Sequence, residues 1–287
     1  MQRAVYIFLL LMFAPLCGYA QDEDLSTACG DDSYPLSIDE SRVLQTTYSV
    51  EFGGEHAFNT YLSPLVQTGW TLSLAGEWSR PMGHSKSWRQ EVEARARLGI
   101  MTNPAGNAYM DDVQADLSWR AIRSFTPVSG LTLGIGVGAL LEGGALYMPR
   151  NSNNPVAARA YMGTTLEGRA AYSFRLWGKC FRLLESVSLP TIGIFFSPHF
   201  GQSYYEIYLG ERDGLVRCGW WGNRFAVNNH IAVEIPVCST RLRLGYRFEA
   251  ANCIASGIDT RITTHAFTLG ITTDWLNVTR RHEKSML

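Results

Sequence analysis

The segment Thr240–Glu249, TRLRLGYRFE, alternates apolar and charged side chains along almost its whole length. One face carries Leu242, Leu244, Tyr246 and Phe248, and the other carries Arg241, Arg243, Arg247 and Glu249. Successive side chains of a β-strand point to opposite faces, so this segment is expected to be a strand with one apolar and one charged face. About ten such segments between Val43 and Trp275 predict an all-β fold, an antiparallel transmembrane β-barrel whose apolar face meets lipid.

The connections between the expected strands alternate in length. The expected strands are Val43–Gly53, Gly69–Ser79, Trp88–Met101, Tyr109–Arg123, Leu131–Gly144, Tyr161–Leu176, Phe181–Gly193, Asn228–Val237, Thr240–Ala250 and Ile262–Trp275. Connections after odd-numbered strands are mostly long, and those after even-numbered strands are shorter. Outer-membrane barrels have short periplasmic turns and long external loops, so we expect both termini in the periplasm. Twelve strands are the alternative, with Ile192–Ser197 and Tyr204–Leu209 as a further pair.

The chain begins with the features of an export signal. Arg3 supplies a positive start, Val5–Pro15 an apolar stretch, and Gly18–Ala20 a small-x-small cleavage site. We therefore expect a cleaved signal peptide over residues 1–20, a periplasmic arm over 21–42, the barrel over 43–275 and a tail over 276–287. The predicted location is the outer membrane of a Gram-negative bacterium.

The overall composition fits a lipid-embedded barrel. The formal net charge is −1, from 25 basic and 26 acidic residues, which argues against a nucleic-acid partner. The 27 glycines, 13 tyrosines and 8 tryptophans supply turns and aromatic residues for the membrane interfaces. The expected partners are outer-membrane lipid and an unknown external ligand or protein.

The face opposite the apolar one is strongly charged, and it should line the lumen. Its charged residues are Glu77, Glu91, Glu93, Arg95, Arg97, Asp112, Asp116, Arg120, Glu167, Arg169, Arg175, Glu234, Arg241, Arg243 and Arg247. Side chains largely fill the interior of barrels of this size. Because both signs of charge occur on neighbouring strands, we favour a salt-bridged plug over the alternative of a small-solute pore. The repeated glycines of Gly134–Gly138 lie on this face and make room for bulky neighbours.

An enzymatic role has weak support. By parity Glu51, Glu142, His230 and Glu249 face inward near the external rim, where a His–carboxylate pair can act as acid and base. No nucleophile motif accompanies them, so a membrane-embedded hydrolase is an alternative to a non-enzymatic structural, binding or transport-associated barrel. No cofactor is expected, and the histidines lack metal-ligand spacing.

The segment Ser188–Leu209, SLPTIGIFFSPHFGQSYYEIYL, is rich in aromatic residues and leads to a Trp-Trp pair. Aromatic loops form binding platforms or lie at the membrane interface. The candidate binding loop consists of His199, Tyr204, Tyr205, Trp220 and Trp221, with packing at the interface as the alternative.

The expected topology sorts the cysteines by membrane side. Cys218 and Cys253 fall in external loops, and Cys180 and Cys238 fall on the periplasmic side. An exported chain can form disulfides. If disulfides form, we expect the pairs Cys218–Cys253 and Cys180–Cys238.

Six segments of the chain resemble one bacterial family, the domain of unknown function 3316. They are TYLSPL (60–65), TNPAGN (102–107), RNSNNPVAARA (150–160), SLPTIGIFFSPHFGQSYYEI (188–207), STRLRLGY (239–246) and THAFTLGI (264–271). The resemblance spans nearly the whole mature chain. It implies an exported, strand-rich, outer-membrane protein, and it supplies no catalytic residues.

Overall fold

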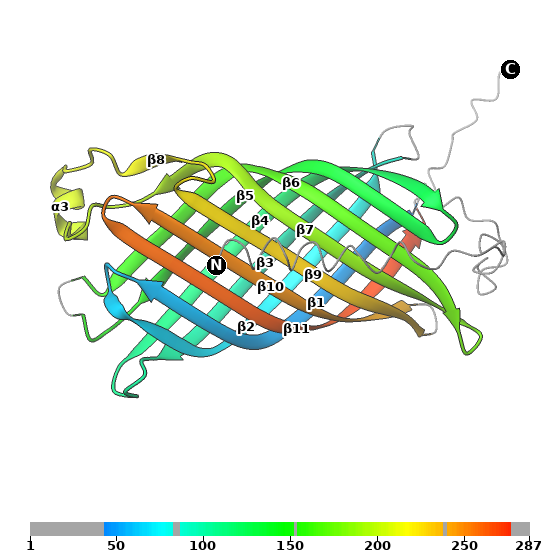
Figure 1. Cartoon of the computed structure of the whole chain (residues 1–287), viewed down its shortest axis with the longest axis horizontal. Coiled ribbons are helices and arrows are strands. Elements are labelled where there is room, and N and C mark those ends of the chain that lie inside the picture. Colours follow the sequence, from blue (N-terminus) through cyan, green and yellow to red (C-terminus); the bar gives the residue numbers. More distant parts are fainter. Residues whose placement is uncertain (1–42, 83–86, 152–153, 238–239, 277–287) are drawn as a thin grey trace, which may run out of the picture.

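The computed structural model of the protein describes residues 43–82, 87–151, 154–237 and 240–276. The expected signal peptide (1–20), the expected arm (21–42) and residues 277–287 of the expected tail lie outside this part. The described chain forms a closed barrel of ten long antiparallel strands, which confirms the predicted fold (Figure 1). The first and last strands pair with each other and close the sheet.

Neighbouring strands along the barrel wall are neighbours in the sequence. The long strands are β1 (Val43–Asn59), β2 (Ser63–Pro81), β3 (Trp88–Thr102), β4 (Tyr109–Val128), β5 (Leu131–Tyr147), β6 (Val156–Leu176), β7 (Lys179–Phe196), β9 (Arg224–Val237), β10 (Thr240–Ala255) and β11 (Ile258–Leu276). A short strand, β8 (Val216–Gly219), pairs with the end of β7. Within the described chain, no helix is long and apolar enough to cross a membrane.

The twelve-strand alternative is wrong. Most of its first segment continues β7 to Phe196, and its second segment is the six-residue helix α3 (Tyr204–Leu209). Ser203 caps this helix in a capping box with Glu206, and Gly210 ends it with a φ of 117°. Both are local helix signals that outweigh the apparent strand pattern.

The two ends of the barrel differ. At the turn end, β6 and β7 are joined by Trp177 and Gly178, which both have positive φ, as a tight hairpin turn requires. At the loop end, where α3 and β8 lie, the connection between β7 and β9 is the longest (Figure 1). The other loops at this end are shorter than expected. For example, only residues 60–62 separate β1 from β2. The hydrogen-bonded ladder between these two strands continues beyond the expected strand ends.

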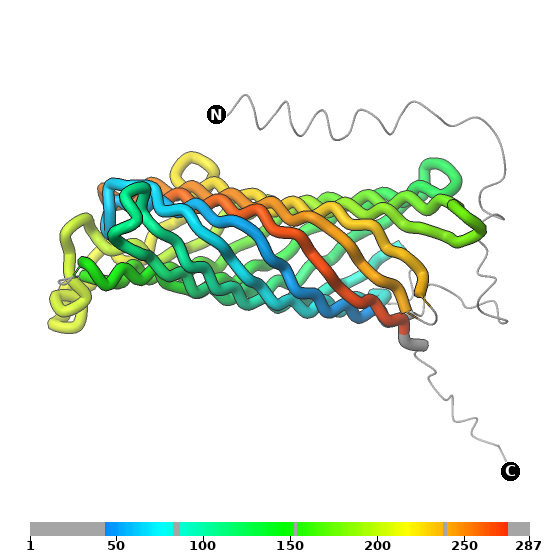
Figure 2. The backbone as a smooth tube through the Cα atoms, turned by 90° about the horizontal axis from the view of Figure 1, so that it is seen from below, coloured from blue at the N-terminus to red at the C-terminus, as the bar shows by residue number. Residues whose placement is uncertain are grey.

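The polarity of the barrel is inverted relative to a soluble protein. Apolar residues of the outer face are exposed, including Phe267 at 74% and Ile135 at 63%, whereas lumen residues such as Glu234 and Arg97 are buried. Soluble monomers do not expose apolar surface of this extent. The strands also tilt across the barrel wall (Figure 2), as closure of a sheet requires. The outer band is therefore a lipid-facing surface.

The glycines of β5 fit closely against β4 and β6. A Cβ atom at Gly138 would lie 2.6 Å from Thr165 Oγ1 and 2.6 Å from the Trp119 carbonyl oxygen. A Cβ atom at Gly134 would lie 3.3 Å from Arg169 Cβ. The small residues thus make room for neighbouring strands and for a lumen arginine, as predicted.

We expect the substitution Gly138→Ala to lower the free energy of unfolding by about 1–3 kcal/mol, because the added methyl group meets fixed backbone. The matched control is Gly143→Ala on the same strand, where no atom lies within 4 Å of the added Cβ. Urea titration of the protein in lipid vesicles measures both. Equal stability of the two variants would contradict the tight fit at Gly138.

Candidate functional site

Buried arginines and carboxylates cross the middle of the lumen. We call Glu51, Glu93, Arg95, Arg120 and Arg247 the central charge belt. Arg247 joins two of its carboxylates, with Nε 2.7 Å from Glu51 Oε1 and Nη2 2.9 Å from Glu93 Oε1. Arg120 donates a hydrogen bond to Glu93, and Arg95 Nη1 lies 3.7 Å from Glu51 Oε2.

The members of the belt come from different parts of the wall. They project from β1, β3, β4 and β10, and each is at most 8% exposed. An isolated buried charge is costly, so such side chains remain inside a barrel only when they are paired. The expected pairing of lumen charges across the interior is confirmed.

A second layer of charges lies on the loop-end side of the belt. Glu249 accepts from two arginines, at 2.5 Å from Arg95 Nη2 and 2.9 Å from Arg97 Nη1. Arg95 also bonds Asp116 at 2.8 Å, and Arg97 lies 3.2 Å from Asp112. These paired groups form a polar floor.

Above this floor lies a cavity of about 190 Å³, the loop-end cavity. Its walls are mainly small or apolar, and they include Leu140, Ala158, Pro190, Ala226 and Ile262. Its remaining lining includes residues of the loops at the same end of the barrel, such as Tyr61 and Pro198. The cavity thus joins apolar walls to a charged floor.

One polar group stands out in the cavity wall. The Arg224 guanidinium carbon lies 3.6 Å from the centre of the Tyr161 ring, and Arg224 Nη2 donates to Glu142. The ring and the carboxylate together hold the guanidinium plane in one orientation. Because the bond to Glu142 uses Nη2, the planar guanidinium presents further N–H donors along its other edges.

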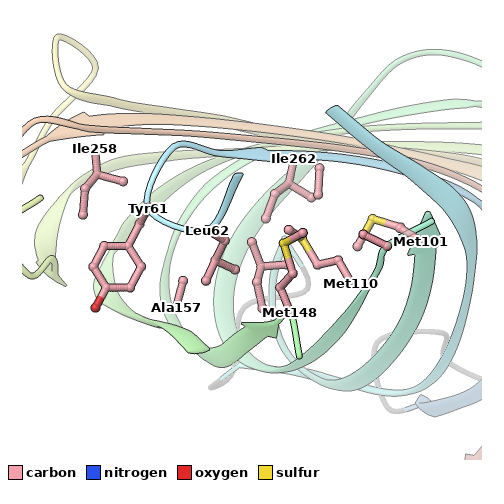
Figure 3. Close-up of a cluster of buried hydrophobic side chains, with 11 residues drawn as sticks. Tyr61, Leu62, Met101, Met110, Met148, Ala157, Ile258 and Ile262 are labelled. Carbon is pink, nitrogen blue, oxygen red and sulfur yellow. The ribbon is translucent and has the colours of Figure 1, made fainter. Parts of the chain in front are cut away.

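An apolar cluster fills the part of the mouth beside the cavity (Figure 3). Its buried members are Ala57, Tyr61, Leu62, Met101, Ala108, Met110, Leu146, Met148, Ala157, Ile258 and Ile262. Three methionines adapt to an irregular space at this end of the lumen. The cluster leaves the loop-end cavity to one side of the mouth.

The connection between β7 and β9 folds over this mouth. The Tyr61 hydroxyl donates to the Gln202 carbonyl oxygen at 2.6 Å, and the Tyr204 hydroxyl accepts from the Ala158 N–H at 2.7 Å. The two tyrosine rings meet edge to face at 6.4 Å. Burial raises the pKa of Tyr61 to about 12 and also raises the pKa of Tyr204, so both hydroxyls are neutral at ordinary pH.

The structure divides the candidate binding loop between two places. Tyr204 packs over the mouth, whereas Tyr205 is 69% exposed on the other side of α3 and His199 is exposed nearby. Trp220 and Trp221 lie in the turn between β8 and β9, on the outer wall of the barrel. The five residues do not form one surface.

The candidate rim cluster does not form as expected, because His230 does not join its carboxylates. Glu51, Glu142 and Glu249 each pair with arginine. His230 lies opposite Arg247 and lines a separate cavity toward the turn end, and its Nε2 has no hydrogen-bond partner among the described residues. Glu249 instead accepts from the Asn228 side chain at 2.7 Å. The expected His–carboxylate pair is therefore absent from the described part of the lumen.

The cysteines require one correction. Cys218 and Cys253 are both free thiols, so the expected external pair does not form. Cys218 lies opposite the exposed Ile194 on the outer face, whereas Cys253 lines the loop-end cavity, and thiols on opposite faces of a wall cannot join. Cys180 is disulfide-bonded, and its expected partner Cys238 lies outside the described residues.

Sequence reasoning missed Tyr161 and Arg224. Tyr161 has the same parity as the lumen residues Glu167 and Arg169 on the same strand, so the alternation rule already placed it inward. Arg224 precedes the expected start of its strand at Asn228, whereas β9 begins at Arg224. Extending the alternation backward from Asn228 by four residues would have placed Arg224 in the lumen.

We expect Arg247→Gln to destabilise the barrel by about 3–5 kcal/mol, because it leaves Glu51 and Glu93 short of their shared buried partner. The matched control is Arg261→Gln. Arg261 is 50% exposed and pairs with Asp259, and an exposed pair contributes only about 0–1 kcal/mol. Unfolding in urea measures both losses. Similar values for the two variants would contradict a stabilising role for the belt.

Comparisons with solved structures show similarity at low sequence identity. Outer membrane protease OmpT from Escherichia coli is 8% identical with a TM-score of 0.48, covering 82% of this chain and 98% of that one. The transport unit of autotransporter AIDA-I from Escherichia coli is 9% identical with a TM-score of 0.42, covering 88% and 96%. The translocator domain of autotransporter NalP from Neisseria meningitidis is 8% identical with a TM-score of 0.40, covering 84% and 91%.

No curated protein matches the sequence significantly. A family model does match, over residues 6–282, and its description is a protein of unknown function, DUF3316. This match covers the whole described barrel and agrees with the resemblance carried by the six sequence segments. The chain belongs to the DUF3316 family.

Proposed function

We propose that the protein is an outer-membrane barrel that binds a small amphipathic molecule in its loop-end cavity and does not conduct solutes through its lumen. The observation that carries this proposal is a cavity at the loop end whose floor is lined by paired charges. The loop end faces the outside of the cell, since long loops of such barrels are external. The expected export signal and the lipid-facing band support the location.

The lining of the cavity favours an amphipathic ligand. Its walls of alanine, proline and larger apolar residues accommodate a short hydrocarbon chain, while Arg224 offers N–H donors to an acidic or carbonyl head group. The arginines and carboxylates of the floor are already paired with one another. A free inorganic ion therefore has little to gain from entering.

Two rival functions receive less support. A pore needs a continuous aqueous path, and the central charge belt occupies the lumen with tightly paired side chains. A hydrolase of the kind considered above needs a base within hydrogen-bond reach of its proton donor, and Glu249 accepts from Asn228 while His230 Nε2 has no hydrogen-bond partner among the described residues. We accordingly propose a binding role without catalysis.

A photoactivatable decanoic acid, carrying a diazirine on its chain, tests binding in lipid vesicles. We expect it to label peptides of the cavity wall, and Ala226→Trp to reduce that labelling about tenfold, or ~1.4 kcal/mol of binding free energy. Ala226 is buried in the cavity wall. The control is Ala139→Trp on the exposed outer face of β5. In this variant the cavity wall should be labelled as strongly as in the wild-type protein. Equal labelling of the two variants would contradict binding of the probe in the loop-end cavity.

Planar-bilayer recording tests the closed lumen. The purified protein should show no steady single-channel conductance, because the paired belt residues bridge the lumen between the loop-end cavity and the cavity at the turn end. The same preparation must first be shown to be folded by resistance to denaturation in cold detergent. Regular conductance steps from folded protein would favour the pore instead.

A further inference from the structure

The wall between β7 and β9 contains a break in its hydrogen-bonded ladder. β7 pairs with β9 over Arg182–Ser188, and with β8 over Gly193–Phe196. Between these stretches, Leu189–Ile192 has no paired strand on this side within the described chain. Facing it, Arg224–Val227 pairs with β10 alone. We call these two facing segments the seam.

The sequence of β7 accounts for the break. Pro190 has no N–H and cannot donate to a neighbouring strand. The next residues form a bulge, because the register with β6 shifts between Thr165↔Pro190 and Gly163↔Gly193. A bulge bends its strand and increases the local twist, which carries this part of β7 out of the ladder.

A side chain takes the place of the missing strand. Trp221 Nε1 donates to the Pro190 carbonyl oxygen at 2.6 Å. Trp221 belongs to a tight turn, in which the Asn223 side chain accepts from the Trp220 N–H and the Asn223 N–H bonds the Trp220 carbonyl oxygen. The turn projects from the barrel wall (Figure 2). A Cβ at position 222 would lie 2.3 Å from the Trp220 ring, so a larger residue there would displace that ring.

The outer side of the seam lies in the lipid-facing band. Leu166 and Met162 on β6 are 46% and 56% exposed, and Ile192 of the seam itself is 64% exposed. Phe225 on the β9 side is 37% exposed. Apolar outward residues thus flank the seam on both strands, so it meets the acyl chains rather than the aqueous phase.

The inner side of the seam is the wall of the loop-end cavity. Pro190 on one strand, and Ala226 and Val227 on the other, line that cavity. Arg224 lies at the loop-end limit of the same segment, where it bonds Glu142. A molecule crossing the seam would find an apolar wall first and a guanidinium group beside it.

We propose that the seam is a lateral route by which a single-chain amphipath passes from the membrane into the loop-end cavity, with Trp221 as its gate. The ligand has a hydrocarbon chain and an acidic or carbonyl head group that Arg224 binds. This inference rests on the binding role proposed above. Trp221 closes the route with one side-chain hydrogen bond, which opens far more readily than a strand ladder.

The test follows the rate at which the photoactivatable decanoic acid labels the cavity from the lipid side. Vesicles containing the protein are preloaded with the probe, and albumin in the surrounding buffer binds any probe that leaves the membrane. Trp221→Ala should speed labelling of the Pro190 and Ala226 peptides about fivefold, the effect of losing one hydrogen bond. Trp221→Phe keeps an aromatic ring without the N–H, and it should give a smaller increase.

The matched control is Trp70→Ala, which removes another outward-facing tryptophan, 45% exposed on β2 and away from the seam. It should label at the wild-type rate. Equal rates for the two tryptophan positions, with the cavity still labelled, would overturn the lateral route and leave the binding role intact. Absence of cavity labelling in every variant would overturn the binding role itself. If Trp221→Ala fails to fold, the labelling rate of Trp221→Phe is compared with that of the control instead.

Discussion

Lipid offers no hydrogen-bond partner to a peptide group, and the architecture of this protein depends on that constraint. A sheet that meets lipid must pair every backbone N–H and C=O within itself, so it has to close. The pairing of β1 with β11 supplies this closure. Each strand then has one face toward lipid and one toward the lumen. The alternation of apolar and charged residues in segments such as Thr240–Glu249 follows from this requirement.

The same constraint applies at the seam between β7 and β9. Where the ladder is interrupted at Pro190, the exposed carbonyl is bonded by Trp221, so the requirement is met by a side chain instead of a strand. A side chain can rotate away without moving the rest of the wall. An interruption in a lipid-facing sheet is costly, and its position directly outside a cavity links it to the proposed binding role.

Charge pairing governs the interior in a comparable way. A lumen of this width is filled by its own side chains, and arginine can bridge two carboxylates through its planar donors. Arg247 and Arg95 use this geometry to connect strands that are distant in the sequence. In the described part of the chain, one cavity lies on the loop-end side of these layers and another lies toward the turn end. The chemistry available to a ligand is therefore concentrated at the loop end.

The sequence by itself determined the barrel, the lipid-facing and lumen faces, and the pairing of opposite charges inside, because strand parity is a local property. Parity also placed Glu142 and Glu249 inward. It could not choose their partners, since contacts such as Arg97–Glu249 depend on the tilt and curvature that bring β3 near β10. Tertiary structure alone separated His230 from the rim carboxylates, turned Cys218 and Cys253 to opposite faces, and placed Trp221 on Pro190. The contact between Trp221 and Pro190 depends on the bulge in β7, whose geometry is set by how several strands meet.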